Sequence, residues 1–331
     1  MSAGKNAGIV GVGSYVPEKI LTNYDLERMV ETSNEWIVTR TGIEQRRIAD
    51  ENTFVSDLAT KAAQRALEDA GMQAEEIELI VVATITADMS SPAAACMVQH
   101  NLGAVNAVAF DINAACSGFV YGLSVASQFI QTGCYKNALV IGAETLSKIT
   151  NWKDRNTCVL FGDGAGAAVL KAVEAPYGIL STHTGTNGSM GKVLTIPALN
   201  LAAEELAKRD QEYARTIWMD GQEVFKFAVK IMVEATKRVL ADVHLGVEDL
   251  DMIIPHQANT RIIDGAAKRL KLNKEKVFTN IQQYGNMSAA SIPVALDEAV
   301  KGGLIQNDDI VVMVGFGGGL TWGSAVVKWQ K

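Results

Sequence analysis

Several residue types that define other protein classes are scarce in this 331-residue sequence. It has 6 prolines, 4 cysteines and 4 histidines, and aromatic residues make up only 6% of the chain. No apolar run approaches the roughly 18 residues of a membrane span, and the first ten residues lack the apolar core of a signal peptide. None of the cysteines forms a C-x-x-C pair, so neither a zinc site nor a redox motif is indicated. We therefore expect a cytoplasmic protein with reduced thiols and no contact with a membrane.

An excess of positive charge is also missing. Lys and Arg together number 30 against 37 Asp and Glu, which gives a net charge of −7. Nucleic-acid binders usually present a basic surface, so we expect no nucleic-acid partner. The 48% of hydrophobic residues and the 29 glycines are typical of a globular protein, and the length suffices for two domains or one large one.

Short apolar runs alternate with longer helical patterns along the chain. This alternation predicts an α/β fold with largely buried sheets. The segment 176–215 is rich in turn residues and is the most irregular part of the sequence. The strands are expected at 77–86, 107–112, 137–144, 166–173, 251–256, 308–316 and 324–329, and the helices at 53–71, 117–133, 221–243 and 260–272.

An internal repeat divides the sequence into two halves. RALEDAGMQAEEIELIVVA begins at Arg65 and RVLADVHLGVEDLDMIIPH begins at Arg238, a separation of 173 positions. A second match pairs GAAVLK, ending at Lys171, with GSAVVK, ending at Lys328. A chance match between charged helical sequences is the alternative. We interpret the pattern as a duplication, with halves at 1–177 and 178–331.

A cysteine stands where the sequence changes from a strand pattern to a helix pattern, in DINAACSGF. Cys116 can be an inert, buried small side chain, or a nucleophile whose pKa the helix N-terminus lowers. The helix after Cys116 ends at Gly133 and its counterpart at Gly303, a separation of 170 that carries Cys116 onto Asn286. The first repeat places His256 just beyond a strand end, where α/β sheets bind ligands. We therefore expect these three side chains to converge.

Six motifs in order resemble those of the thiolase-like condensing enzymes, and most closely of the β-ketoacyl-acyl carrier protein synthase III family. They are TSNEWIVTRTGIEQRRI, DINAACSGF, RNTCVLFGDGAGAAVL, IIPHQANTRII, YGNMSAAS and GFGGGLTWGSA. The resemblance runs from about Ile9 to Trp329. It implies a thiolase-like fold of duplicated halves in five layers, α-β-α-β-α, and a homodimer. The family's catalytic trio falls on Cys116, His256 and Asn286.

The resemblance also implies a reaction, a decarboxylative condensation that begins a fatty-acid chain. Cys116 would take an acyl group from acyl-CoA as a thioester, with the backbone amides of Cys116 and Gly318 as the oxyanion hole. Malonyl-acyl carrier protein would enter next, and His256 and Asn286 would donate hydrogen bonds to its thioester carbonyl. Loss of carbon dioxide generates the carbanion, so no cofactor is implied. We expect no metal, because no second ligand lies near His256 in the sequence.

Substrate-binding positions follow from the same resemblance. An ordinary packing role for Trp36, and a merely solvated face for the basic residues, are the alternatives. One residue departs from the family, because Met287 stands where close relatives often carry threonine, which leaves the orientation of Asn286 open. The CoA-binding set is Thr32, Trp36, Arg40, Arg155 and Asn259, and the carrier-protein docking set is Lys226, Arg261, Lys268 and Arg269.

The acyl pocket suggests which primers are used. Relatives that prefer acetyl-CoA carry a phenylalanine before a proline, on a loop from the partner subunit, and Ser91 occupies that position here. We therefore expect primers longer than acetyl, unless another bulky side chain such as Met89 or Met219 fills the space.

Three other functions are compatible with parts of the pattern. One is a related Cys-His-Asn ketide synthase of secondary metabolism, and another is a non-catalytic acyl-CoA-binding scaffold. The third is a cysteine hydrolase, which the duplicated α/β pattern and the glycine run 317–319 disfavour.

Overall fold

The first of two central sheets is built from the N-terminal part of the chain. The structure is a computed structural model and describes residues 5–197 and 215–331. In this sheet β4 pairs in parallel with β5 and β6, and β7 runs antiparallel to β6 and β1. The strand order is β1 (Lys5–Tyr15), β7 (Asp163–Glu174), β6 (Asn137–Thr145), β4 (Leu79–Ala83) and β5 (Val108–Ile112).

The second sheet has four strands. In the order given below, the first and second strands are parallel, whereas the second and third, and the third and fourth, are antiparallel. The order is β11 (Met252–Pro255), β12 (Ile310–Gly317), β13 (Thr321–Lys328) and β8 (Gly178–Thr186).

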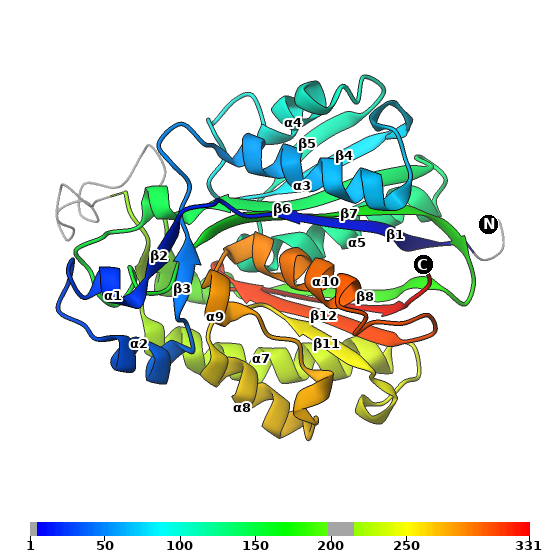
Figure 1. Ribbon diagram of the computed structural model, residues 1–331. Helices are drawn as coiled ribbons and strands as arrows, with labels where there is room; N and C mark the ends of the chain where they lie inside the picture. Colours follow the sequence, from blue (N-terminus) through cyan, green and yellow to red (C-terminus); the bar gives the residue numbers. More distant parts are fainter. Residues whose placement is uncertain (1–4, 198–214) are drawn as a thin grey trace.

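Helices form three layers around these sheets, as Figure 1 shows. α3 (Val55–Ala70) and α4 (Ala94–Leu102) cover the outer face of the first sheet, and α7 (Gly221–Ala241) and α8 (Thr260–Leu270) cover that of the second. α5 (Gly118–Gln131) and α10 (Ser291–Lys301) lie between the sheets and contact both. The predicted five-layered α-β-α-β-α arrangement is therefore confirmed.

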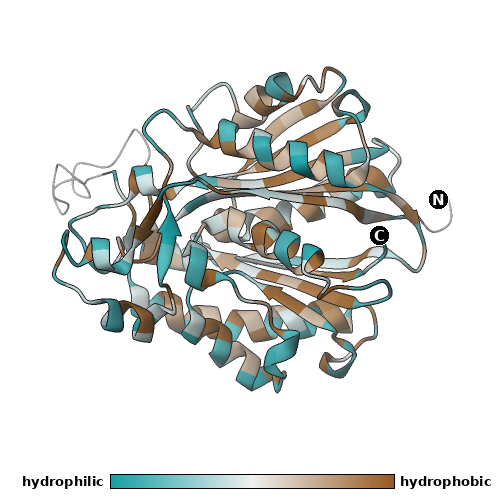
Figure 2. Cartoon of the chain, in the orientation of Figure 1, coloured by the Kyte–Doolittle hydropathy of each residue, from teal (hydrophilic) through white to brown (hydrophobic). Residues whose placement is uncertain are grey.

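Burial explains the character of each layer. The middle layer is a single apolar core in which Phe119, Leu123, Ile292 and Leu296 are buried between strands of both sheets. The outer helices instead bury one face, and Figure 2 shows hydrophilic positions on the outward side of α3 above the largely hydrophobic strands.

Smaller elements gather at one end of the layers (Figure 1). They pair as β2 with β3 and β9 with β10, and they carry several residues of the site described below. They are β2 (Ile20–Thr22), α1 (Asn23–Leu26), α2 (Asn34–Thr41), β3 (Gln45–Arg47), β9 (Leu194–Thr195), β10 (Trp218–Met219) and α9 (Ile281–Tyr284). The 3-10 turns are η1 (Ala74–Glu76), η2 (Ala115–Ser117), η3 (Leu146–Ile149), η4 (Gly188–Val193), η6 (Val247–Asp249), η7 (Lys274–Lys276) and η8 (Ser288–Ala290).

All seven expected strands and four expected helices are present, but the sequence prediction missed α4, the four short strands that the structure describes outside the central sheets, and β1 and β8 within them. β1 is rich in glycine, which normally disfavours strands. A Cβ at Gly13 would lie 2.3 Å from the backbone nitrogen of Ala66, so the glycine lets α3 approach this strand closely. β8 lies inside the segment 176–215 that we expected to be irregular, and it completes the second sheet.

The repeat is confirmed in the structure, with one correction. The separation of 173 relates η1 to η6, the start of β4 to that of β11, and the start of α5 to that of α10. Ala115 and Ser288, also 173 apart, share an unusual positive φ of 47° and 46°. The counterpart of Cys116 is therefore Ala289, and the prediction that it was Asn286 is wrong. α5 has 14 residues and α10 has 11, and the difference lies at the far end of the helix.

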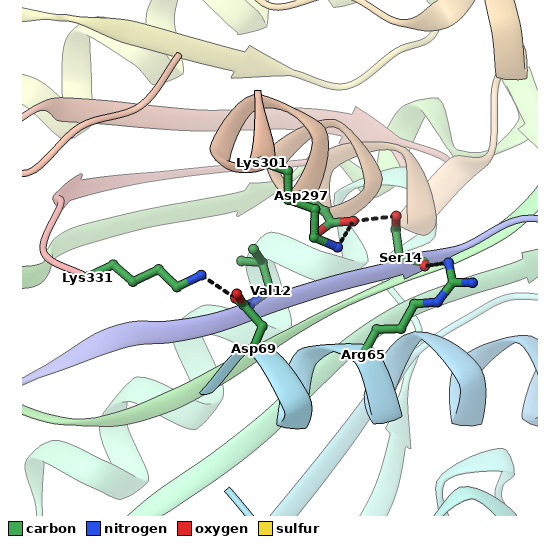
Figure 3. Close-up of polar contacts among 7 residues, drawn as sticks. All are labelled: Val12, Ser14, Arg65, Asp69, Asp297, Lys301 and Lys331. Atoms are coloured by element: carbon green, nitrogen blue, oxygen red, sulfur yellow. Dashed lines mark hydrogen bonds and ion pairs between the residues drawn. The ribbon is translucent and has the colours of Figure 1, made fainter. Parts of the chain in front are cut away.

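Polar contacts fix β1 between the two halves (Figure 3). Ser14 Oγ donates to Asp297 Oδ2 of α10 at 2.5 Å, and Arg65 of α3 donates to the Ser14 carbonyl at 2.7 Å. Asp297 is 2% exposed and also pairs with Lys301 at 2.8 Å. At the other end of α3, Asp69 accepts from the Val12 amide at 2.8 Å and pairs with Lys331.

We predict that Asp297→Ala lowers the free energy of unfolding by about 1–3 kcal/mol, because Ser14 Oγ loses its acceptor. Asp297→Asn keeps an acceptor oxygen and gives up only the ion pair with half-exposed Lys301, so it should cost about 1 kcal/mol or less. Urea unfolding of both variants measures the difference. Equal costs would show that the Ser14 contact does not stabilise the fold.

Candidate active site

One cavity of about 990 Å³ connects the surface with the three residues that the sequence analysis brought together. Cys116, His256 and Asn286 all line it, and each is nearly buried, at 8%, 1% and 8% exposure. Trp36 and Arg40 line its outer part. The predicted convergence of cysteine, histidine and asparagine is therefore present in the structure.

Cys116 lies in the turn η2 that leads into α5. The preceding residue, Ala115, has a positive φ, and Ser117 Oγ donates to the Ala114 carbonyl at 2.7 Å, which braces the turn. Burial raises the pKa of the Cys116 thiol to about 12. This corrects the expectation that the helix start lowers it, because the loss of water outweighs the hydrogen bonds that favour the thiolate.

His256 follows β11 and is fixed from two sides. Its amide donates to the Val314 carbonyl at 2.8 Å, and its ring meets Phe316 edge-on with centroids 5.3 Å apart. Nδ1 lies 2.6 Å from Ser291 Oγ, whose other acceptor, the Ser288 carbonyl, is 2.9 Å away. In the tautomer with the ring proton on Nε2, the Ser291 hydroxyl donates to Nδ1 instead of to the Ser288 carbonyl. Burial lowers the pKa of His256 to about 3, so the ring is neutral.

Asn286 is held by backbone and side chain alike. Its amide donates to the Leu160 carbonyl at 2.8 Å, and its Oδ1 accepts from the Ser288 amide at 2.8 Å. Because Oδ1 is occupied, Nδ2 is the group that can donate into the cavity. Met287 is fully buried against Val16 and Val294. The orientation of Asn286 therefore rests on Ser288, and a hydroxyl at position 287 is not needed for it.

The glycine run at the end of β12 approaches Cys116 closely. A Cβ at Gly317 would lie 2.5 Å from the Cys116 amide nitrogen, and one at Gly315 would lie 3.3 Å from the Cys116 carbonyl. Gly318, the predicted oxyanion-hole residue, lines a second pocket together with Cys116. These glycines thus let the end of β12 pack directly against the backbone of Cys116.

This second pocket has a volume of about 320 Å³ and begins at Cys116. Its walls are mostly apolar, and apart from Cys116 and Gly318 the sequence analysis named none of the residues that form them. Ser91 is exposed and Met89 is 46% exposed, while Met219 lines the larger cavity. Within the described part of the chain, the pocket is lined by Ile85, Asn113, Ala115, Cys116, Leu146, Phe161, Leu194, Ile196, Pro197, Ile217, Ser288 and Gly318.

The predicted CoA-binding residues lie near the outer part of the large cavity. The guanidinium carbons of Arg40 and Arg155 lie 5.8 and 5.5 Å from the Trp36 ring centroid. Asn259 Nδ2 donates to the Arg40 carbonyl at 3.0 Å, which joins α8 to α2. Thr32 Oγ1 is buried and has no hydrogen-bond partner. A base that stacks on Trp36 would displace one of the two arginines.

The predicted docking residues are all exposed and lie on two helices that pack together. Arg261 and Lys226 line the same cavity, Arg261 against the Phe225 ring at 5.5 Å and Lys226 paired with Glu223 at 2.7 Å. Lys268 and Arg269 lie at the other end of α8.

Three polar residues around the trio were missed by the sequence analysis. Ser291 contacts the ring of His256, Ser288 orients Asn286, and Glu144 is a fully buried carboxyl near the thiol. Serine and glutamate at such positions carry no motif of their own, although Ser288 and Ser291 belong to the quoted YGNMSAAS. Of the other cysteines, Cys158 is buried, while Cys96 and Cys134 are exposed.

Two features are absent from the described residues, 5–197 and 215–331. They contain no group of three or more His, Cys, Asp or Glu side chains that could hold a metal ion. None of their helices is long and apolar enough to cross a membrane.

Comparisons with known proteins agree with this geometry. Family profiles described as 3-oxoacyl-[acyl-carrier-protein (ACP)] synthase III and its C-terminal part match residues 110–188 and 240–329. The chain is 61% identical over 325 residues to β-ketoacyl-[acyl-carrier-protein] synthase III of Caldanaerobacter subterraneus subsp. tengcongensis, covering 98% of each chain. It is 47% identical to the solved 3-oxoacyl-[acyl-carrier-protein] synthase III of Aquifex aeolicus, with a TM-score of 0.91 and coverage of 98% and 100%. The priming β-ketosynthase of the R1128 polyketide pathway is similar at 35% identity, TM-score 0.92 and coverage of 99% and 97%.

The buried neutral ring of His256 should make the fold sensitive to acid. The unfolded chain takes up a proton near pH 6.5 that the folded chain does not accept until about pH 3, so stability falls as pH decreases through this window. Between pH 6.5 and 4.5 the loss should approach about 2.5 kcal/mol, at 1.4 kcal/mol per unit. The contribution of Glu144 to stability changes with pH in the opposite sense, because burial raises the pKa of its carboxyl to about 7.

The contribution of His256 is therefore measured as a difference between variants. Urea unfolding of the wild type and of His256→Asn across this pH range should show a smaller acid loss in the variant. His100→Asn, at an exposed position on α4, is the matched control and should keep the wild-type slope. Parallel slopes for the wild type and His256→Asn would contradict a neutral buried ring.

Proposed function

The chain belongs to the β-ketoacyl-[acyl-carrier-protein] synthase III family, and we propose that it condenses an acyl-CoA primer with malonyl-acyl carrier protein to begin fatty-acid synthesis. The observation that carries this proposal is the single cavity that holds Cys116, His256 and Asn286 at its buried part and Trp36 and Arg40 farther out. Such a cavity suits a long, flexible thioester whose polar end stays near the surface.

The first half-reaction acylates Cys116. The sulfur attacks the thioester carbonyl of acyl-CoA, and the amides of Cys116 and Gly318 stabilise the oxyanion. The acyl chain enters the 320 Å³ apolar pocket, since this pocket begins at the same sulfur. CoA leaves through the large cavity.

The second half-reaction generates a carbanion by decarboxylation. His256 Nε2 and Asn286 Nδ2 donate hydrogen bonds to the thioester carbonyl of malonyl-acyl carrier protein, which stabilises the enolate left by carbon dioxide. A neutral histidine suits this role, because it can donate a hydrogen bond without giving up its proton to the enolate. The enolate carbon then attacks the acyl group on Cys116. No cofactor enters this scheme, and its absence stays a prediction.

The binding surfaces follow the charge distribution. Thr32, Trp36, Arg40, Arg155 and Asn259 hold CoA, and Lys226, Arg261, Lys268 and Arg269 receive the acidic carrier protein. The homodimer would form at β5, an edge strand with Val108 49% exposed, because unpaired strand edges readily pair. A cytoplasmic location stays a prediction.

A role in secondary metabolism is the second candidate. The similarity to the R1128 priming ketosynthase, at 35% identity, favours it, whereas the 61% identity to a β-ketoacyl-[acyl-carrier-protein] synthase III favours fatty-acid initiation. The scaffold and hydrolase alternatives predict, respectively, no acyl adduct and release of free acid.

Mass spectrometry of the intact protein after incubation with acetyl-CoA should show an acyl adduct that Cys116→Ser lacks. With malonyl-acyl carrier protein the wild type should then form a β-ketoacyl product. His256→Ala and Asn286→Ala should each lower condensation by about 10²–10³-fold and still acylate, because both donors act on the second substrate. Release of free acid without a ketoacyl product would contradict the proposed function.

Primer length tests the role of Ser91. We expect hexanoyl-CoA and isobutyryl-CoA to be accepted, since each buried methylene contributes about 0.8 kcal/mol. Ser91→Phe should shift kcat/KM toward acetyl-CoA by tenfold or more, whereas Ser90→Phe, one residue earlier on the same exposed loop, should not. Strong acetyl preference in the wild type, unchanged by Ser91→Phe, would show that this position does not set the pocket depth.

A further inference from the structure

Glu144 is a buried carboxyl that the reaction described above does not use. It lies at the end of β6, has no exposed surface, and accepts hydrogen bonds from Thr86 Oγ1 at 2.5 Å and Thr84 Oγ1 at 3.2 Å. The Ile85 amide donates to it at 3.2 Å. All these donors are uncharged. A carboxyl kept in a dry interior with uncharged donors is costly, so its presence beside a nucleophile calls for a functional explanation.

Ser288 connects this carboxyl with all three residues of the trio. Its amide donates to Asn286 Oδ1, and its carbonyl lies 2.9 Å from Ser291 Oγ, which contacts the His256 ring. Its side-chain Oγ is buried and has no hydrogen-bond partner among the described residues. It nevertheless lies close enough to the Cys116 thiol and the Glu144 carboxyl to lower the pKa of each. The unpartnered hydroxyl is therefore a neighbour of both the nucleophile and the acid.

The backbone keeps Ser288 in this position. Its φ of +46° is unusual for a residue with a side chain, and it matches the φ of Ala115 at the corresponding turn. Ser288 and Cys116 line the same acyl pocket. The turn thus places Ser288 beside the nucleophile at the acyl pocket.

Acylation requires a proton acceptor for the Cys116 thiol. Its pKa of about 12 means that the resting thiol is protonated, and the His256 ring, with a pKa of about 3, accepts protons poorly. Burial raises the pKa of Glu144 to about 7, near the value that suits a general base at neutral pH. The titratable group that faces Glu144 is the thiol itself. Its other neighbours are the hydroxyls of Thr84, Thr86 and Ser288.

We propose that Ser288 and Glu144 form a proton relay behind Cys116 that serves the acylation step, an inference that rests on the proposed function. As the sulfur attacks the acyl-CoA carbonyl carbon, the thiol proton passes to Ser288 Oγ, and Ser288 passes its own proton to the Glu144 carboxylate. A carbon–sulfur bond to Cys116 forms, and the bond to the CoA sulfur breaks. Because the Cys116 sulfur is then acylated, Glu144 returns the proton to Ser288, and Ser288 gives its own proton to the departing CoA thiolate, so no further reactant is needed.

Single-turnover acylation with acetyl-CoA, followed by rapid quench and intact-protein mass spectrometry from about pH 5.5 to 9, tests the relay. The wild-type rate constant should rise with pH through about 7, as Glu144 ionises. Glu144→Gln should lower it about ten- to hundredfold and remove the rise, and Ser288→Ala should lower it by a similar factor. Condensation by enzyme acylated beforehand should change less than threefold.

Matched controls separate the relay from loss of structure. Asp163→Asn removes another buried carboxyl that accepts a serine hydroxyl, from Ser147 at 2.5 Å, and should keep the rise near pH 7. Ser127→Ala removes a buried hydroxyl on α5 and should leave the rate constant unchanged.

Two outcomes would overturn the relay while leaving the proposed function intact. One is an equal loss of both half-reactions with an unchanged pH profile in Glu144→Gln, which would mean a purely structural carboxyl. The other is full acylation by Ser288→Ala, which decides the matter even if Glu144→Gln fails to fold. A wild type that acetyl-CoA does not acylate at any pH would refute the proposed function itself.

Discussion

The close approach of two turns to the ends of two strands is the constraint on which the site depends. A Cβ at Gly142 of β6 would lie 2.1 Å from the carbonyl oxygen of Ala289, and one at Gly317 of β12 would lie 2.5 Å from the amide of Cys116. These glycines let η2 and η8 enter the middle layer from opposite halves. Without this approach, Cys116 and Asn286 would not share a cavity with His256, which follows the end of β11.

The duplicated halves use the same turn for different purposes. Asn113 and Asn286 are counterparts at the separation of 173, and the Oδ1 of each accepts from an amide two residues later, at 3.3 and 2.8 Å. Bracing the turn is therefore the shared role of this asparagine. In the first half the braced turn presents a thiol. In the second half the asparagine itself lines the cavity, so one structural device supplies both the nucleophile and a hydrogen-bond donor.

The features that could be predicted from the sequence are those with a periodic or repeated pattern. Apolar runs indicated the strands, the repeat indicated two related halves, and the strand end at His256 indicated a site. β1 and the residue that corresponds to Cys116 in the second half could not be predicted in this way. The first depends on glycines that contact α3, and the second depends on which end of a helix carries three extra residues. The predicted lowering of the pKa of the Cys116 thiol was wrong in direction, because burial raises this pKa and burial is a property of the assembled layers.

The charges of the site are divided between its wet and dry parts. Arg40, Arg261 and Lys226 are exposed at the cavity and can meet phosphates and carboxylates in water, where a cation needs no buried partner. The inner part instead contains a neutral imidazole, a carboxamide and backbone amides. In a cavity that excludes water, such fixed dipoles stabilise an enolate or oxyanion strongly. A buried cation is not needed, and it would bind the carboxylate of the malonyl group and oppose the loss of carbon dioxide. Substrate binding at the outer part of the cavity therefore uses charged side chains, whereas the reaction at the inner part uses neutral hydrogen-bond donors.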